Sequence, residues 1–102
     1  MITTHVLDTA QGKPAAGVGV TLFVKEAGAW RELGRGQTDA DGRLRTLAPG
    51  PVAAGTYRLL FDTAARSAFF PEVSVVFAIE AGASYHVPLL ISPFGYSTYR
   101  GS

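Results

Sequence analysis

Two histidines and the last residues of the sequence offer most of the reactive chemistry of this chain. Histidine changes charge near neutral pH, so His5 and His86 are candidates for general acid–base catalysis. Arg100 stands near the end of the sequence, and its planar fork of donors suits a flat, oxygen-rich or anionic ligand. Terminal residues are poorly ordered unless something ties them down. We expect the segment Tyr99 to Ser102 to be both an ordered strand end and part of a site.

The two histidines also have a purely structural interpretation. His86 lies in a predicted strand that is apolar on both faces, with Pro88 and Leu90 on its own face and Val87, Leu89 and Ile91 on the other. A strand of that kind is covered on both sides, and we expect a second subunit to supply one of the covers. His86 then faces an interface, either as a packed, hydrogen-bonded residue or as an acid–base group. His5 has the same two interpretations.

Other arginines and turn motifs are weaker signals. Arg43 and Arg45 share one face of a predicted strand, and Arg43 is expected to be an ordinary surface residue. Asp39-Ala40-Asp41-Gly42 resembles the start of a calcium loop but lacks the later ligands. Gly34-Arg35-Gly36 is too short for a phosphate-binding loop, and Ser102 lacks the following helix of a nucleophile elbow. Two histidines far apart make a poor zinc set, so we expect no metal site.

The composition narrows the class of protein. The chain is 47% hydrophobic, carries a formal net charge of +1 and contains no cysteine. Its scattered basic residues indicate neither a nucleic-acid surface nor attraction to an anionic membrane. Disulfides and thiolate chemistry are excluded. The sequence shows no secretory leader and no run of about eighteen apolar residues, so we expect a soluble, cytoplasmic protein.

Short alternating segments between turn signals predict one all-β domain over residues 1–102. Apolar residues at every second position of 18–24 indicate a strand with one buried face. Residues 12–17 are expected to be a loop, Asp41-Gly42 a turn, and Thr63 to Ala68 a weak helix. The predicted strands are Ile2 to Leu7, Val18 to Glu26, Trp30 to Gly36, Arg43 to Leu47, Thr56 to Asp62, Glu72 to Glu80, Ser84 to Ile91 and Tyr96 to Arg100.

Both ends of the chain carry motifs of a known family. Thr4-His5-Val6-Leu7-Asp8-Thr9, followed by Gly17-Val18, resembles the opening of the transthyretin-like proteins. Tyr99-Arg100-Gly101-Ser102 resembles the specific signature of their enzymatic branch, the 5-hydroxyisourate hydrolases of urate breakdown. The resemblance extends over nearly the whole chain. Further matching segments are Thr38-Asp39-Ala40-Asp41-Gly42-Arg43, Tyr57-Arg58-Leu59, Phe61-Asp62-Thr63, Phe70-Pro71-Glu72-Val73 and His86-Val87-Pro88-Leu89-Leu90.

This resemblance implies a two-sheet β-sandwich of about eight strands, assembled as a homotetramer with active sites between dimers. The implied reaction opens the ring of 5-hydroxyisourate to 2-oxo-4-hydroxy-4-carboxy-5-ureidoimidazoline. It needs no metal or organic cofactor, and His86, coupled to His5, activates the water. The implied catalytic residues are His5, Arg45, His86 and Ser102, and the implied substrate-binding residues are Arg45, Tyr99, Arg100, Gly101 and Ser102.

The chain departs from the family pattern in one place, and two other functions stay open. Only residues 64–69 separate Asp62-Thr63 from Phe70-Pro71-Glu72-Val73, where the family has a longer stretch with a short helix. We therefore expect a shortened or missing helix. The alternative functions are a non-catalytic carrier of a small aromatic ligand on the same fold and a β-sandwich interaction module. Hormone-carrying transthyretins lack the histidine, arginine and tail set, so the enzyme is favoured.

Overall fold

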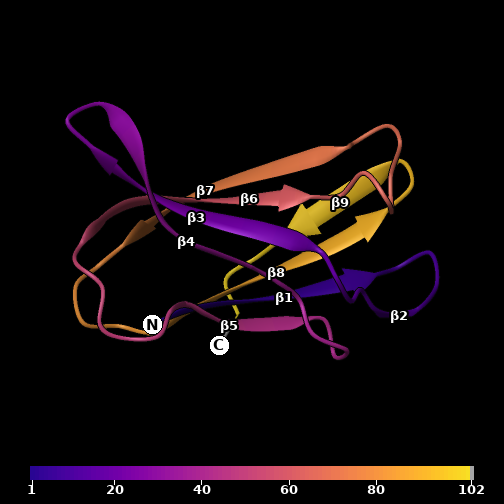
Figure 1. Cartoon of the computed structure of the whole chain (residues 1–102), viewed down its shortest axis with the longest axis horizontal. Helices are drawn as coiled ribbons and strands as arrows, with labels where there is room; N and C mark the ends of the chain where they lie inside the picture. The colour runs from indigo at the N-terminus through magenta and orange to yellow at the C-terminus, as the bar shows by residue number, and fades with distance from the viewer. Residues whose placement is uncertain (102) are drawn as a thin grey trace.

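A computed structural model describes residues 1–101, which form two stacked β-sheets (Figure 1). The β3 sheet contains, in spatial order, β4 (Ala29–Gln37), β3 (Gly19–Glu26), β6 (Gly55–Asp62) and β7 (Glu72–Ile79). The β1 sheet contains β2 (Lys13–Pro14), β1 (Ile2–Asp8), β8 (Tyr85–Ser92) and β9 (Gly95–Thr98), and β5 (Arg43–Ala48) pairs with the first half of β1.

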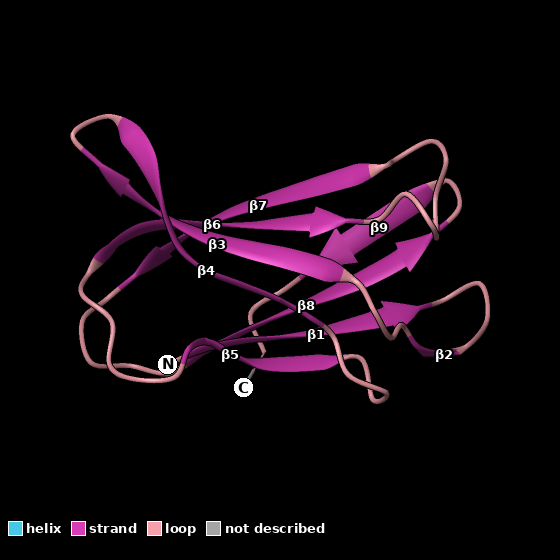
Figure 2. Cartoon of the chain, viewed as in Figure 1, coloured by secondary structure: helices cyan, strands magenta, loops and turns pink. Residues whose placement is uncertain are grey.

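The architecture confirms the expected all-β sandwich, with three local differences. Residues 1–101 contain no helix, so the weak helix at Thr63 to Ala68 is a turn instead (Figure 2). Lys13–Pro14, predicted as loop, is a short strand paired with Leu7 and Asp8. The last strand ends at Thr98 rather than Arg100, because the chain leaves β8 there and returns only through an isolated bridge from Gly101 to His86. Within the described part of the chain, no helix is long and apolar enough to cross a membrane.

Alternation along the strands separates the core from the outward face of the β1 sheet. In β1, the even-numbered residues Ile2, Thr4, Val6 and Asp8 are buried, while the odd-numbered ones are half-buried. The core between the sheets includes Leu22, Leu59, Phe61, Leu89 and Ile91, all fully buried. Burial stabilises the fold by about 1.5–3 kcal/mol for each such large apolar side chain. The outward face is therefore free to carry polar residues.

The two ends of the chain meet through the parallel pairing of β1 with β8. The register places Thr3 opposite His86 and His5 opposite Pro88. Thr4 Oγ1 donates to the carbonyl of Val87 at 2.6 Å, a side-chain bond that links positions 83 residues apart. Parallel strands need a long crossover, and here the whole β3 sheet lies within it. This pairing brings the strand that carries His5 beside the strand that carries His86.

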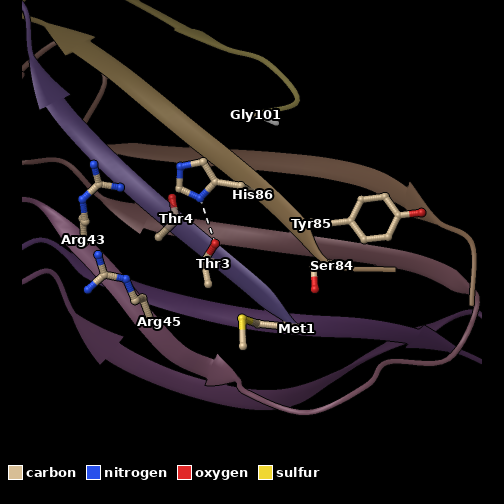
Figure 3. Close-up of a pocket in the computed structure, with 9 residues that line it drawn as sticks. All are labelled: Met1, Thr3, Thr4, Arg43, Arg45, Ser84, Tyr85, His86 and Gly101. Carbon is tan, nitrogen blue, oxygen red and sulfur yellow. Dashed lines mark hydrogen bonds between the residues drawn. The ribbon is translucent and has the colours of Figure 1, made fainter. Parts of the chain in front are cut away.

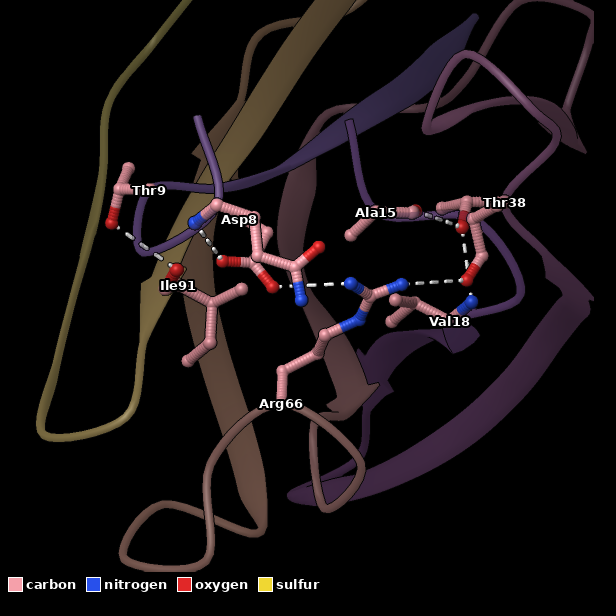
Figure 4. A network of polar contacts seen from close by, with 9 residues as sticks. Asp8, Thr9, Ala15, Val18, Thr38, Arg66 and Ile91 are labelled. Atoms are coloured by element: carbon pink, nitrogen blue, oxygen red, sulfur yellow. Dashed lines mark hydrogen bonds and ion pairs between the residues drawn. The ribbon is translucent and has the colours of Figure 1, made fainter. Parts of the chain in front are cut away.

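The connection between β6 and β7 is a tight turn that is clamped to the rest of the molecule. Thr63 Oγ1 donates to the carbonyl of Phe70, and Ser67 Oγ donates to the carbonyl of Pro93 at 2.7 Å. Arg66 Nη1 lies 3.1 Å from Asp8 Oδ2, and Arg66 Nη2 donates to the carbonyl of Ala16 (Figure 4). These bonds satisfy the polar groups of a segment too short for a helix.

The carboxylate of Asp8 is the buried member of this clamp. Its side chain is only 5% exposed, against 22% for Arg66. Burial opposes ionisation, but hydrogen bonds from the Gln11 amide and from Arg66 outweigh it and hold the pKa of Asp8 below its ordinary value. Asp8 is therefore ionised at neutral pH and depends on Arg66 for its charge partner.

Replacing Arg66 by alanine is expected to lower the free energy of unfolding by about 1.5–3 kcal/mol at neutral pH, the usual worth of a hydrogen bond to a charged group. The pKa of Asp8 is lowered on folding, so this contribution is present above the unfolded value of 3.8 and is lost as the pH falls through the folded pKa. Denaturant unfolding of both proteins across acid pH measures the difference.

The matched control is Arg31→Ala, because the pair between Arg31 and Glu26 is exposed on both sides and should contribute little. The proposed stabilisation by the Arg66–Asp8 pair would be contradicted if Arg66→Ala lowered the free energy of unfolding no more than the control does. A loss that does not change with pH would contradict it as well.

Candidate active site

The outward face of the β1 sheet is hollowed into a pocket of about 310 Å³ (Figure 3). A pocket of this size suits a small ligand. Strands β1, β5 and β8 contribute its walls, together with the C-terminal tail. The lining residues are Met1, Thr3, Thr4, Arg43, Arg45, Ser84, Tyr85, His86 and Gly101.

His86 is the histidine that lines this pocket. It is half-buried, and its Nδ1 lies 2.8 Å from Thr3 Oγ1. Its Nε2 makes no hydrogen bond to the residues that the structure describes. The tail lies against the same residue, because the Gly101 amide donates to the carbonyl of His86 at 2.7 Å. One ring nitrogen is thus held by the protein, and the other is available to a ligand or a water.

The surroundings of His86 keep its imidazole neutral. Burial lowers the pKa of His86 first, and electrostatic interactions with Arg43, His5 and Arg45 lower it further. A hydrogen bond with the backbone of Thr3 acts in the opposite direction and does not compensate. A histidine with a lowered pKa is unprotonated at neutral pH, which is the form that a general base requires.

His5 is fixed by the turn between β4 and β5. Its Nε2 lies 2.8 Å from the carbonyl oxygen of Asp41, and a carbonyl only accepts, so this nitrogen carries the proton. Asp39 Oδ1 closes the turn by accepting from the amides of Asp41 and Arg43. Gly42 has a φ of 75°, and a Cβ there would lie 2.4 Å from the carbonyl of Val6. The turn therefore requires glycine and positions His5 against the start of β5.

Arg43 is a site residue that the sequence reasoning missed. It pairs in register with His5 across β1 and β5, is half-buried and lines the pocket together with Arg45. Of the two arginines, Arg43 has the larger effect on the pKa of His86. The available signal was its position directly after the Asp41-Gly42 turn, which sets the register of β5 against His5.

The tail residues divide between two places. Gly101 reaches the pocket, whereas the guanidinium carbon of Arg100 lies 4.7 Å from the centre of the Tyr85 ring. Arg100 and the exposed Tyr99 line a separate groove between β7 and the β8–β9 pair. Ser102 lies outside the described residues. The structure therefore brings together Arg45, His86 and Gly101 around the pocket. His5 does not line the pocket but is close enough to act on His86. The side chains of Tyr99 and Arg100 lie in the separate groove.

The arrangement is suited to hydrolysis of a flat, oxygen-rich molecule. A neutral imidazole provides the base for a water, and the guanidiniums of Arg43 and Arg45 provide positive charge for ligand oxygens. No carboxylate side chain lines the pocket. Among residues 1–101, no three His, Cys, Asp or Glu side chains lie together as a group that could hold a metal ion.

Comparison with known proteins places this chain among relatives of two kinds. Residues 2–101 match the sequence profile described as the HIUase/Transthyretin family. A protein of Salmonella dublin named 5-hydroxyisourate hydrolase is 46% identical over 110 residues, which cover 100% of this chain and 81% of the relative.

Solved structures show the same division. The 5-hydroxyisourate hydrolase of Klebsiella pneumoniae superposes with a TM-score of 0.86 at 38% identity, covering 99% of this chain and 98% of that one. Sea bream transthyretin, solved in complex with thyroxine, superposes with a TM-score of 0.88 at 32% identity, covering 98% and 93%. The backbone superposes about equally well on the hydrolase and on the transthyretin. The two kinds of protein must therefore be distinguished by the residues in the pocket.

Replacing Gly101 by alanine is expected to detach the tail from His86. A Cβ on Gly101 would lie 2.6 Å from Cδ2 of the imidazole, closer than real side-chain contacts allow. Hydrogen exchange at residue 101 should become faster because the bond to the His86 carbonyl is lost, and the NMR signals of the His86 ring should shift.

Gly95→Ala is the matched control, since its added Cβ would meet only Ser92 Oγ at 3.6 Å. Retained protection at residue 101 in Gly101→Ala would show that the tail does not lie against the imidazole as described.

Proposed function

The chain belongs to the HIUase/Transthyretin family, and on that premise we propose that it is a 5-hydroxyisourate hydrolase acting in urate degradation. The proteins named 5-hydroxyisourate hydrolase that it resembles are 46% and 38% identical to it, against 32% for the transthyretin solved with thyroxine. The observation that carries the proposal is the neutral His86 beside Arg43 and Arg45 in one open pocket. A carrier of an aromatic ligand has no need of a base there.

The reaction opens the six-membered ring of 5-hydroxyisourate by hydrolysis. Water adds to the amide-like ring carbonyl, the bond from that carbon to the ring nitrogen breaks, and the nitrogen takes up a proton. The carbon becomes a carboxylate and the released nitrogen becomes part of a ureido group. The product is 2-oxo-4-hydroxy-4-carboxy-5-ureidoimidazoline. The protein must supply a base for the water, a proton for the nitrogen and positive charge for the developing oxyanion.

His86 is the base in this scheme. Its Nε2 takes a proton from the water as the water attacks, and the resulting imidazolium returns the proton to the leaving nitrogen. A positioned acid–base group of this kind contributes about 10²–10⁴-fold to the rate. The same positive charges that lower the pKa of His86 keep it unprotonated before the reaction.

Arg43 and Arg45 bind the substrate ring and stabilise the oxyanion. Guanidinium groups present planar pairs of donors, which match ring carbonyl oxygens. His5 lies beside Arg43 and donates to Asp41 through Nε2, so its Nδ1 is the remaining acceptor on that side. We assign His5 to orienting the water together with His86, and Arg45 to the outer wall of the pocket.

The tail completes the site in the assembled protein. Gly101 already lies against His86, and Ser102 follows it directly in the sequence. We propose that Ser102 adds its hydroxyl to the polar wall. Tyr99 and Arg100 reach substrate from a facing subunit or after the tail turns, because in the single chain they lie over Tyr85 and the groove beside β7.

A homotetramer built as a dimer of dimers is part of the proposal. β7 and β9 are edge strands of the two sheets, and edge strands present unpaired backbone groups to a partner. Pairing of both edges with a second copy forms the dimer, and the outward face of the β1 sheet then meets another dimer over the pocket. We also keep within the proposal one domain over residues 1–102 and a cytoplasmic location.

Replacing His86 by asparagine is expected to slow hydrolysis by about 10²–10⁴-fold, because asparagine fills similar space but is no base. The assay generates 5-hydroxyisourate with urate oxidase and follows its disappearance by absorbance, with and without the protein. Light scattering checks that the variant keeps the mass of the parent protein, which we place at four chains.

Arg31→Ala serves as the control, since Arg31 pairs with Glu26 on the other sheet and should leave the rate unchanged. If the parent protein does not accelerate the decay, the hydrolase proposal is wrong and the carrier alternative gains. Full activity in His86→Asn would overturn only the role of His86.

Replacing Arg43 by alanine is expected to move the acid limb of the kcat/KM profile to higher pH. Activity falls as the pH drops through the pKa of the base, and Arg43 lowers the pKa of His86. Removing its positive charge raises that pKa, while His5 and Arg45 remain near His86. NMR titration of the His86 ring in the free protein measures the same change, and an unshifted limb would contradict this electrostatic role.

A further inference from the structure

We propose that Thr3 is a positioning residue that holds His86 as the tautomer with hydrogen on Nδ1, so that Nε2 presents its lone pair to the pocket. The consequence for rate rests on the hydrolase function proposed above, whereas the tautomer itself does not. Nδ1 of a neutral histidine can donate or accept a hydrogen bond, and so can a threonine hydroxyl. Which of the two groups donates is therefore decided by their surroundings.

The contact between the two side chains is built into the sheet. Thr3 and His86 are register partners in the parallel pairing of β1 and β8, and Oγ1 and Nδ1 lie 2.8 Å apart on the outward face (Figure 3). Hydrogen bonds on both sides of this pair fix the backbone, from the Tyr85 amide to Met1 and from Thr4 Oγ1 to Val87. Threonine is stiff at χ1 because it is β-branched. The hydroxyl is therefore a rigid support for the ring.

Two arrangements satisfy this distance, and they have opposite chemical consequences. If the hydroxyl donates to Nδ1, the ring hydrogen sits on Nε2, which then faces the pocket as a donor. If Nδ1 donates to the hydroxyl, Nε2 is free to accept a proton. Only the second arrangement gives a base that a water in the pocket can reach.

The charges around the pocket favour the second arrangement. Arg43 and Arg45 line the pocket, and their positive potential favours a lone pair on the nitrogen that faces it over an N–H group. Thr3 Oγ1 makes no other hydrogen bond among residues 1–101, so it is free to accept from Nδ1. Its own hydrogen is then left for a water or a substrate oxygen in the pocket. Thr3 thus helps to set the direction of proton transfer.

The first test needs no substrate. Nitrogen NMR of the imidazole at a pH where His86 is neutral should show hydrogen on Nδ1 of the parent protein. Thr3→Val keeps the shape and removes the acceptor, so the hydrogen should redistribute toward Nε2. Thr3→Ser restores the hydroxyl and should restore the parent tautomer. Hydrogen on Nε2 in the parent protein, or no change in Thr3→Val, overturns the proposal.

The second test measures the consequence for rate. In Thr3→Val, kcat for 5-hydroxyisourate should fall by about 100-fold, the lower end of the range of acid–base contributions, with little change in KM, and Thr3→Ser should recover most of it. The control is Thr9→Val, which removes another threonine bond to β8, from Oγ1 of Thr9, the residue after β1, to the carbonyl of Ile91. Equal losses in Thr3→Val and Thr9→Val, or no rescue by serine, would show a merely structural role. An inactive parent protein with the predicted tautomer would refute the hydrolase proposal but not the positioning.

Discussion

The site depends on one structural constraint, the parallel pairing of the first strand with the eighth. On the inner face this pairing is stabilised by core residues from both strands, among them Ile2, Val6, Leu89 and Ile91, all fully buried. On the outer face the same register sets Thr3 beside His86 and leaves room for β5 to add Arg43. Because side chains alternate along strands, slippage of β1 by one residue would turn Thr3 and His5 toward the core. Core stability therefore specifies the geometry of the site.

The pocket concentrates positive charge without a carboxylate partner from its lining. Asp39 lies outside that lining, and its electrostatic interactions with Arg45 and Arg43 offset part of this charge. The turn at Asp39–Gly42 and the backbone of β1 hold the groups in place. In the proposed mechanism the result is a base that is neutral before reaction and an environment that favours negative charge on the substrate. Elsewhere the chain compensates its buried charge, as the pair between Asp8 and Arg66 shows.

Much of the fold could be predicted from the sequence, and less of the site. Alternating apolar residues indicated the sandwich because this pattern is local. The family pattern predicted a shortened or missing helix after Asp62-Thr63, whereas the local composition predicted a weak helix at Thr63 to Ala68 that does not form. His86 was found as a histidine on a strand apolar on both faces. Arg43 and Thr3 were not found, since their roles depend on which strands pair and in what register. The orientation of the Arg100 side chain was not predicted either, because it depends on the Tyr85 ring, which the tail contacts only in the folded chain.

The central claim is that the pocket around His86 opens the substrate ring by activating a water. A crystal structure with an unreactive planar analogue of 5-hydroxyisourate tests it most directly. We predict that the analogue binds in the pocket of the β1 sheet, with ring oxygens on Arg43 and with a water held between His86 Nε2 and the carbonyl that would react. An analogue bound elsewhere on the molecule, or in this pocket without contact to His86 or its water, would contradict the account.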